Sequence, residues 1–549
     1  MRFASVVIAL IFVFHCSAQK TPATDNKLSR PKLVVGLVID QMRWDYLYRY
    51  YNRYGNDGFK RLLSQGFTCE NTMIPYTPTV TGAGHACIYT GSVPAIHGIV
   101  ANDWIERSNE SLMYCSRDTS VRSLGTSPDY STGKMSPKNM LTNTIGDELK
   151  LATNFRSKVI GVALKDRGGI LPAGHSANAA YWFDDSTGNW ISSTYYFTDI
   201  PNWVKQYNSL RKQDALMKND WTLLYPQSTY LQSTEDDKAY ERVLWSDGKR
   251  TFPHKYQSVI GSKNYNVFRA SPFGNTFTLD FAKDAITNEK LGAGTETDML
   301  CVSLSSTDYT GHWFGPNSLE QEDTYLRLDK DIADFLNYLD KTIGKNNYLF
   351  FLSADHGSPQ IAGLLKEKKY TTAGTLNNNT IVVNMNKLCK QQFGADTLVK
   401  KIYDYQLYMD MKRIDSLKLN RKEVKAFLVD YLKSLNEVWN AYDVDDFSTI
   451  SMPSKIKERL ANSYYFRRSG DIQFFYKPQY TDYTTTGLEH GAWYPYDSHI
   501  PLLFYGWNIK PGKLNREVYM TDIAPTISAM LKIQMPNGCI GKVIEEVMK

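Results

Sequence analysis

Five short apolar runs predict the strands of the core. They are rich in valine, isoleucine and leucine, and they cover residues 33–39, 159–164, 299–304, 348–352 and 500–505. Such runs lack polar alternation, which is typical of strands buried on both faces, as in a parallel sheet. Before the fourth run, apolar residues recur at spacings of four, three and four from Leu328 to Leu339, so one stripe of a helix over 322–341 faces inward. This alternation predicts an α/β fold with a mainly parallel central sheet and helices on both faces.

Two segments break this pattern, and we interpret them as insertions that cap the core. Residues 183–296 are rich in Tyr, Trp, Ser, Asn and Asp without a clean period, and residues 395–480 are charged, partly helical and then rich in tyrosine. Neither segment is set apart by a repeat or a low-complexity linker. We therefore expect one domain over residues 19–549 that carries both insertions, and a monomer, because the insertions would cap the site within one chain.

The first 18 residues have the pattern of a secretory signal peptide. A basic start at Arg2 is followed by an apolar run and by a small-residue cleavage site, Cys-Ser-Ala, at 16–18. We expect a protein that is periplasmic or secreted. Cys16 could instead carry a lipid anchor, although His15 before it fits such a site poorly. No later run reaches the roughly 18 apolar residues of a membrane span.

Composition and charge argue against a nucleic acid partner, a disulfide scaffold and a cysteine-based metal site. The formal net charge of +6 comes from 63 Lys and Arg against 57 Asp and Glu without a basic run, so we expect no nucleic acid partner. Six cysteines remain after the signal peptide, too few for a disulfide scaffold in a chain of this length, and no C-x-x-C metal knuckle is present. The reactive groups must therefore be sought among carboxylates, histidines and hydroxyls.

Carboxylates follow three of the predicted strands. Asp40 ends the first, Asp355 ends the fourth with His356 beside it, and Asp308 follows the third with His312 four residues later. Ligands of open α/β sheets gather beyond the carboxyl ends of the strands, so these side chains should meet at one edge. Each aspartate taken alone is equally well explained as a helix N-cap or a turn residue.

Three carboxylates at one edge require a cation, because like charges raise one another's pKa and destabilise the fold. Aspartate and histidine ligands without a cysteine cluster suit Zn²⁺ best, with Mn²⁺ or Fe as alternatives. His490, in a His-Gly pair upstream of the fifth run, offers a further imidazole, although an ordinary loop histidine would look the same. The sequence therefore predicts a metal centre.

The segment VTGAGHACIYTG, residues 80–91, resembles a glycine-loosened turn that enters a helix. Thr81 would then lie at a helix N-terminus, where backbone N–H groups and the helix dipole favour negative charge. That position stabilises a threonine alkoxide or a phosphate bound to it. Thr79 is the rival candidate, and spacing alone does not separate the two; a plain threonine N-cap is the structural alternative.

Together these motifs resemble a known family. Strand-ending Asp40, TGAGHACIYTGSVPAIHGIVAN, SSTDYTGHWFG, SADHG and LEHG look like the alkaline phosphatase superfamily, in the branch that contains the nucleotide pyrophosphatases/phosphodiesterases. GVALKDRGGILPAGH and TVTGAGHA are more similar to the secreted flavobacterial PafA-type alkaline phosphatases, which use a threonine nucleophile and two zinc ions. The resemblance covers most of the mature chain, and its motifs are specific in combination. It implies that the α/β core is alkaline-phosphatase-like, with the two insertions as cap segments.

The resemblance also implies a role for each matching residue. One zinc would be held by Asp40, Thr81, Asp355 and His356, and a second by Asp308, His312 and His490. In the diesterase branch the nucleophile precedes a histidine by four residues, as Thr81 precedes His85, which favours Thr81 over Thr79. His85 and His97 are interpreted as structural, with satisfied rings. The implied reaction is a two-step phosphoryl transfer through a phosphothreonine.

Substrate binding needs positive charge beyond the two ions, because three carboxylates and an alkoxide cancel the charge of two Zn²⁺. Lys165 and Arg167 close the strand VIGVALKDR at an i, i+2 spacing, so both would point to one face and bind phosphate oxygens. Asn102 would donate an amide hydrogen bond. A phosphate monoester carries about two negative charges near neutral pH and a diester one, so this pair favours monoesters.

Two other functions compete with a phosphomonoesterase. A phosphodiesterase or nucleotide pyrophosphatase on the same scaffold would need an apolar or aromatic pocket, which the Tyr and Trp residues of 181–201 could supply in part. A non-catalytic binding protein of this fold should have lost metal ligands, yet all seven are present. A sulfatase is disfavoured because no C/S-x-P-x-R motif lies near the nucleophile.

Overall fold

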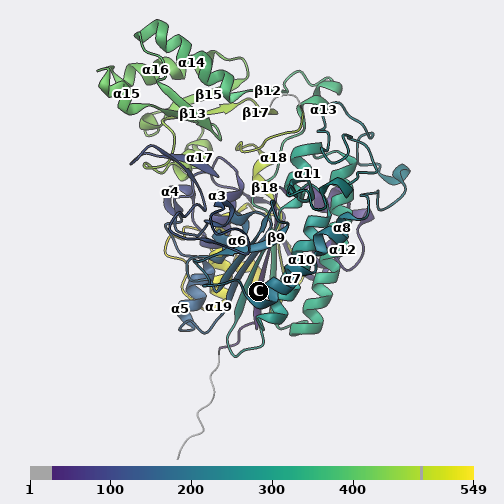
Figure 1. Cartoon of the computed structure of the whole chain (residues 1–549). Coiled ribbons are helices and arrows are strands. Elements are labelled where there is room, and N and C mark those ends of the chain that lie inside the picture. The colour runs from purple at the N-terminus through teal and green to yellow at the C-terminus, as the bar shows by residue number, and fades with distance from the viewer. Residues whose placement is uncertain (1–27, 483–485) are drawn as a thin grey trace, which may run out of the picture. The chain divides into compact units, whose positions relative to one another are not determined.

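The computed structural model describes residues 28–482 and 486–549 (Figure 1). The expected signal peptide, residues 1–18, lies outside the described residues. Residues 31–549 form one compact unit.

A ten-stranded sheet runs through this unit. Its order is β20 (Gly512–Leu514), β2 (Phe67–Cys69), β19 (Leu502–Gly506), β11 (Tyr348–Ser353), β1 (Leu33–Ile39), β10 (Asp298–Leu304), β7 (Val159–Ala163), β8 (Ala179–Asp184), β9 (Asn189–Ser193) and β6 (Ser123–Leu124). The five strands from β11 to β8 are parallel, with β1 between β10 and β11. All residues of β1, β10 and β11 are buried, which confirms that their unbroken apolar runs belong at the centre of a parallel sheet.

The fifth predicted strand, β19, pairs antiparallel with β11 and with β2. Its residues Leu502–Tyr505 are nonetheless buried. A continuous apolar run therefore reports burial on both faces, and it does not determine the direction of the strand.

Helices cover both faces of the sheet, as the alternating pattern predicts (Figure 1). One group consists of α3 (Thr81–Thr90), α5 (Ile145–Ala152), α6 (Asp166–Ala173) and α19 (Ile523–Leu531), and the other includes α10 (Phe273–Asn288) and α12 (Leu319–Leu339). The helix predicted over 322–341 is α12, which begins with Ser318 accepting a hydrogen bond from the Gln321 N–H at 3.1 Å. Its predicted stripe, from Leu328 to Leu339, is buried.

A second, smaller sheet lies farther along the chain. Its order is β13 (Val399–Tyr403), β14 (Gln406–Met409), β16 (Ile472–Tyr476) and β15 (Val438–Asp443). It packs with α14 (Asn378–Phe393) and α16 (Arg421–Ser434) around its own apolar cluster, which includes Met385, Leu428 and Phe474 (Figure 1). The described residues 486–498, which include His490, precede the main-sheet strand β19 in the sequence.

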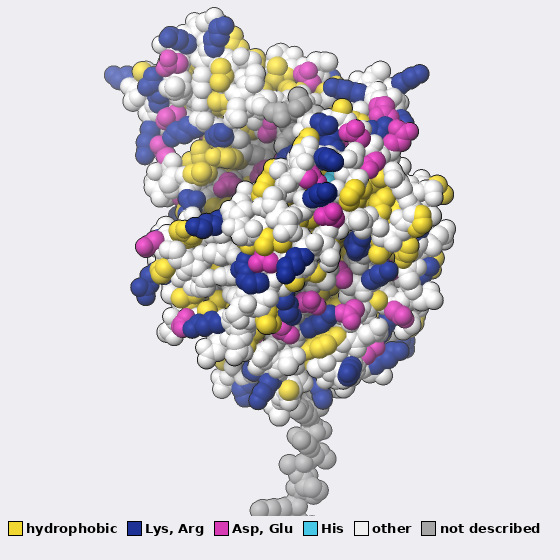
Figure 2. Space-filling model, turned by 45° about the vertical axis from the view of Figure 1, so that its right-hand side comes forward, with side chains coloured by type: hydrophobic (Ala, Val, Ile, Leu, Met, Phe, Trp, Pro, Cys, Tyr) yellow, Lys and Arg dark blue, Asp and Glu magenta, His cyan; other side chains and the backbone are white. Residues whose placement is uncertain are grey.

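Positive and negative side chains are mixed on the face of the molecule that is shown in Figure 2. Figure 2 shows lysine and arginine side chains interspersed with aspartate and glutamate over the face that it presents. This distribution agrees with the dispersed charge of the sequence.

Close packing of α6 on the sheet depends on Gly161 in β7. A Cβ at this position would lie 2.0 Å from the Gly169 carbonyl oxygen and 3.1 Å from the Ala173 Cβ, both in α6. We predict that Gly161→Ala lowers the free energy of unfolding by about 1–3 kcal/mol, because helix backbone must move to admit the methyl group. Urea unfolding followed by circular dichroism measures this. Gly294→Ala is the matched control, since nothing lies within 4 Å of a Cβ there; equal losses in both variants would contradict the packing argument.

Candidate metal centre and active site

The three strand-ending aspartates meet at one edge of the sheet. Asp40 follows β1, Asp355 lies two residues beyond β11, and α11 (Ser306–Phe314) starts beyond β10 and carries Asp308. Because β10, β1 and β11 are parallel neighbours, their carboxyl ends share an edge. All three side chains are buried.

Asp40, Asp355 and His356 form a first group that could hold a metal ion. The His356 Nε2 lies 3.5 Å from Asp40 Oδ1 and 3.5 Å from Asp355 Oδ2. The His356 Nδ1 lies 3.0 Å from the Gly357 carbonyl oxygen, to which it can donate, so that Nε2 is free to bind a metal. Within the part of the chain that the structure describes, Asp40 Oδ1 and His356 Nε2 are buried without a hydrogen bond. Buried polar atoms normally have a partner, so these atoms fit a bound cation.

Asp308, His312 and His490 form a second group. The Nε2 atoms of His312 and His490 lie 3.2 Å and 3.6 Å from Asp308 Oδ1. Their Nδ1 atoms face the carbonyl oxygens of Leu488 and Thr79 at 2.7 Å and 2.9 Å. Each ring is thus oriented by a backbone acceptor, which directs the other nitrogen toward Asp308.

The two groups are adjacent. The rings of His356 and His490 stack with centroids 3.7 Å apart, so one histidine of each group touches the other. In each group the three ligand atoms lie within 4.8 Å of one another. Two carboxylates with one histidine and one carboxylate with two histidines are donor sets that suit a divalent metal such as zinc.

Electrostatics supports cations at both positions. Burial, together with the charges of Asp308 and Asp355, raises the pKa of Asp40 well above its usual value. Burial also favours a neutral His312, but Asp308 and Glu489 raise its pKa to about 9. A metal ion bound to Nε2 would take the place of that proton.

Thr81 is the first residue of α3, is buried and lines the cavity of the candidate site. Its Oγ1 lies 3.4 Å from Lys165 Nζ. The rival Thr79 donates its hydroxyl hydrogen to the Ala492 carbonyl oxygen at 3.0 Å, away from the ligands. The geometry therefore favours Thr81 as the nucleophile candidate.

Lys165 and Arg167 reach the site by a different route from the predicted one. The strand β7 ends at Ala163, Lys165 is the N-cap residue of α6, and Arg167 lies in its first turn. The prediction that both close a strand at an i, i+2 spacing is wrong, because the Gly-rich segment after them continues as a helix. Lys165 is nevertheless 2% exposed, so it is no solvent-facing loop charge.

Lys165 pairs with two of the ligand carboxylates. Its Nζ lies 2.7 Å from Asp40 Oδ2 and 2.5 Å from Asp308 Oδ2. Burial would lower the pKa of Lys165, but Asp308 and Asp40 outweigh it and hold the pKa above its usual value. The lysine therefore stays charged beside Thr81.

Arg167 and Asn102 point into the same cavity. The Arg167 Nη1 donates to the Tyr114 hydroxyl at 3.1 Å, and its buried Nε makes no hydrogen bond to any described residue. The Asn102 Oδ1 accepts the Gly82 N–H at 2.8 Å, so its amide NH₂ is left to donate. Both residues present donors that an anion would satisfy.

The cavity has a volume of about 290 Å³ and brings together seven of the predicted residues. These are Thr81, Asn102, Lys165, Arg167, Asp308, His312 and His490. Sequence reasoning missed Arg242, Asp404 and Glu489 on its wall. Glu489 stands next to a predicted ligand, but Arg242 and Asp404 come from the segments interpreted as insertions, where no motif marks them.

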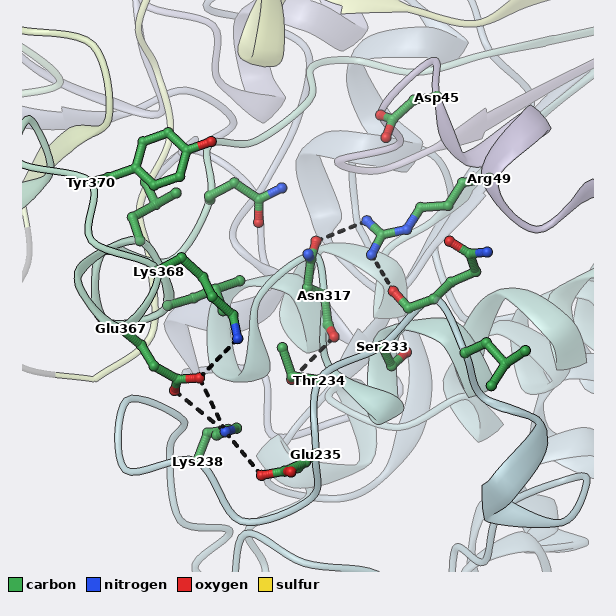
Figure 3. A pocket seen from close by; sticks show the side chains of 15 residues that line it. Asp45, Arg49, Ser233, Thr234, Glu235, Lys238, Asn317, Glu367, Lys368 and Tyr370 are labelled. Carbon is green, nitrogen blue, oxygen red and sulfur yellow. Dashed lines mark hydrogen bonds and ion pairs between the residues drawn. The ribbon is translucent and has the colours of Figure 1, made fainter.

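A larger cavity, of about 770 Å³, contains none of the predicted site residues (Figure 3). Its charged groups pair with one another or with polar neighbours: Lys238 lies 3.3 Å from Glu367, and Arg49 donates to Asn317 at 2.8 Å. Although this cavity is larger, its paired charged groups do not mark it as a catalytic site.

Of the two histidines interpreted as structural, His97 accepts the Ile99 N–H at 3.1 Å but leaves its buried Nε2 without a hydrogen bond among the described residues, whereas His85 has the satisfied ring that this predicts. Its Nε2 lies 2.8 Å from Ser303 Oγ, and its Nδ1 lies 2.9 Å from the Thr81 carbonyl oxygen. The same Nδ1 is 3.3 Å from Asp355 Oδ2. His85 thus also connects the start of α3 to a candidate metal ligand.

Comparison with known proteins agrees with this geometry. Residues 34–496 match the type I phosphodiesterase / nucleotide pyrophosphatase family. The chain belongs to this family. Among its relatives, the alkaline phosphatase PhoV of Synechococcus elongatus is 49% identical over the whole of both chains. The alkaline phosphatase PafA of Elizabethkingia meningoseptica is 48% identical over 97% of this chain and 96% of its own.

The fold of this family member is close to that of PafA. A crystal structure of PafA has a TM-score of 0.93 and 48% identity, and it covers 95% of this chain and 100% of the PafA chain. A relative from Myroides odoratus, 49% identical over the whole of both chains, bears the name calcium-transporting ATPase. Over the described residues of the present chain, no helix is long and apolar enough to cross a membrane.

Metal removal should destabilise the protein. We predict that chelation lowers the free energy of unfolding by about 4 kcal/mol per ion for an ion held at a thousand times its Kd, because the folded state alone assembles both ligand groups. Calorimetry with and without EDTA measures this, and added zinc should restore the transition. An Asp40→Asn/Asp308→Asn variant should respond less to EDTA. An unchanged transition in the unmodified protein would contradict the assignment of both groups.

Proposed function

We propose that this family member is a zinc-dependent alkaline phosphatase that hydrolyses phosphate monoesters through a phosphothreonine at Thr81. The observation that supports it most directly is the cavity in which Lys165, Arg167 and Asn102 face Thr81 and the second ligand group. PhoV and PafA, both named alkaline phosphatases, support the same activity for this chain by similarity.

The proposal assigns the two ligand groups to two zinc ions. Asp40, Asp355, His356 and the Thr81 hydroxyl would hold one, and Asp308, His312 and His490 the other. When bound, these ions supply Lewis-acid charge that favours the threonine alkoxide and the leaving oxygen. The three protein ligands of the second ion would leave its fourth coordination position for a substrate, as catalytic zinc sites do.

Protein groups would perform the remaining steps. The α3 N-terminus places the Thr81 oxygen where backbone N–H groups favour negative charge. Arg167 and the Asn102 amide would bind non-bridging phosphate oxygens and hold phosphorus in line with Thr81. Lys165, 3.4 Å from Thr81 Oγ1, would stabilise both the alkoxide and the bound phosphoryl group. Water would then release phosphate from the threonine and regenerate the hydroxyl.

Three of the aromatic residues expected to supply part of a diesterase pocket lie in the core. Tyr181, Trp182 and Trp190 are buried at 2% exposure or less. Trp190 stacks on Phe281 with centroids 4.3 Å apart and belongs to the core beneath α10. The cavity wall carries Tyr309 and Trp313 together with Lys165 and Arg167, whose charge suits a dianion better than a monoanion. A non-catalytic binding role is disfavoured because all seven ligands are present and six of them converge in two groups.

The remaining assignments are part of the same proposal. We propose export to the periplasm or the medium after cleavage near residue 18, one catalytic domain over residues 19–549, a monomer, and no nucleic acid partner. The substrates would be small phosphate monoesters.

Thr81→Ala should abolish turnover and keep zinc. We expect kcat for p-nitrophenyl phosphate to fall by about 10³-fold or more, because the covalent route is lost. Zinc content by elemental analysis and the thermal transition should change little. Thr81→Ser is the control and should retain measurable activity and form a trapped phosphoserine at low pH. Wild-type rates in Thr81→Ala would refute the nucleophile.

The ratio of kcat/KM for p-nitrophenyl phosphate to that for bis(p-nitrophenyl) phosphate should lie far above one in the zinc-loaded enzyme. In Arg167→Ala, and further in a Lys165→Ala/Arg167→Ala variant, we expect this ratio to fall by about 10-fold or more, because the second negative charge of the monoester loses its partners. Arg242→Ala is the control for Arg167→Ala, because it also removes one positive charge from the cavity wall. A wild-type ratio below one would move the protein to the diesterase branch.

A further inference from the structure

Gln41 touches both ligand groups. It follows Asp40 directly and is fully buried. Its backbone N–H donates to Asp355 Oδ1 at 3.1 Å, and its side-chain Nε2 donates to Asp308 Oδ1 at 2.7 Å. Gln41 therefore follows Asp40 of the first group and donates hydrogen bonds to Asp355 of the first group and Asp308 of the second.

The backbone of Gln41 is held in an unfavourable conformation. Its φ is +63°, in the left-handed region that residues with a side chain rarely adopt. Non-glycine residues persist in this region only where surrounding contacts determine them, and such positions cluster at functional sites. The turn directs the N–H toward Asp355 and the side chain toward Asp308.

The side chain of Gln41 is seated against α11. A Cβ at Gly311 would lie 2.0 Å from Gln41 Oε1 and 3.0 Å from its Cδ, so this glycine leaves the space that the amide occupies. The Oε1 atom is buried and makes no hydrogen bond within the described chain. The only polar contact of this amide among the described residues is thus the donation to Asp308, the carboxylate shared by His312 and His490.

We infer that Gln41 is a positioning residue that fixes the spacing of the two metal groups, its backbone orienting Asp355 and its side chain orienting Asp308. This inference rests on the proposed function for the identity of the metal. It assigns the two roles to different atoms of one residue. A side-chain substitution keeps the N–H and removes the Nε2 donor. It should therefore weaken the binding of the ion at Asp308, His312 and His490 and leave the affinity for the other ion unchanged.

The test measures zinc affinity directly. Metal-free wild type and Gln41→Met, which has similar length and no donor, are titrated with zinc against a chromophoric chelator to give two dissociation constants. We expect one constant to rise about 10- to 100-fold in Gln41→Met, the usual effect of losing a hydrogen bond to a ligand, and the other to change less than about 3-fold. Cobalt substitution should change the absorption bands of one site only.

Gln213→Met is the matched control. Gln213 is 2% exposed and lies in α8 (Lys212–Met217), outside the candidate site. Both constants should match wild type in this variant. Circular dichroism and the thermal transition of the zinc-loaded variants show whether each one folds.

Gly311 supplies an independent perturbation of the same contact. Gly311→Ala should displace the Gln41 amide and raise the same dissociation constant. In a Gln41→Ala background the amide is gone, so the added methyl group should cost little. A loss from Gly311→Ala that is equal in both backgrounds would show that the effect does not pass through Gln41 and would overturn the inference.

The outcomes separate this inference from the proposed function, because turnover of p-nitrophenyl phosphate is measured in parallel. Unchanged dissociation constants in Gln41→Met, with active wild type, overturn the positioning role and leave the phosphatase standing. If Gln41→Met loses affinity for one ion only, and the wild type binds zinc but does not turn over p-nitrophenyl phosphate, the positioning role is supported and the phosphatase is refuted. Uptake of a single zinc by wild type overturns both.

Discussion

The site depends on the repulsion among Asp40, Asp308 and Asp355, three carboxylates buried at the edge of a parallel sheet. Burying unpaired charge costs several kcal/mol per ion even after relaxation, so the fold must provide compensating charge. Lys165 supplies one positive charge and contacts two of the three. The remainder requires cations, and the same cations are the ones that phosphoryl transfer requires.

Backbone groups hold this arrangement in a consistent way. The Nδ1 atoms of His312, His356 and His490 each face a carbonyl oxygen, which leaves each Nε2 directed toward a carboxylate. Asp355 Oδ1 accepts two backbone N–H groups, from Gln41 and His356, while its Oδ2 faces the ligand position. The ligand atoms are thus selected before any metal binds, because the other lone pairs are occupied.

Features that depend on local pattern could be predicted from the sequence. The core strands β1, β10 and β11 and the helix α12 are marked by runs and spacings, because burial on both faces of a sheet imposes an unbroken apolar run. The aspartates could be predicted because the residues just after parallel strands gather at the carboxyl edge of the sheet. The strand-to-helix boundary after Ala163 was misplaced, since the first turn of α6 looks like a continued strand in sequence.

Features made by contacts between distant segments could not be predicted. Gln41 has an ordinary side chain in an ordinary position, and its left-handed backbone and its reach to Asp308 exist only in the folded chain. Arg242 and Asp404 reach the cavity from segments without a readable period. The resemblance to a family assigns roles only to residues in the motifs that the family shares, and Gln41, Arg242 and Asp404 lie outside those motifs.

The pairing of Thr79 with His490 has a consequence for the order of assembly. These residues lie 411 positions apart, yet the Thr79 carbonyl fixes the ring of His490 and the Gly491 carbonyl accepts the Thr79 N–H. At a synthesis rate of about 5–20 residues per second, His490 therefore leaves the ribosome tens of seconds after Thr79. A nascent chain carries the Thr81 segment long before it can complete the second ligand group, so the candidate site is complete only when nearly the whole polypeptide has emerged.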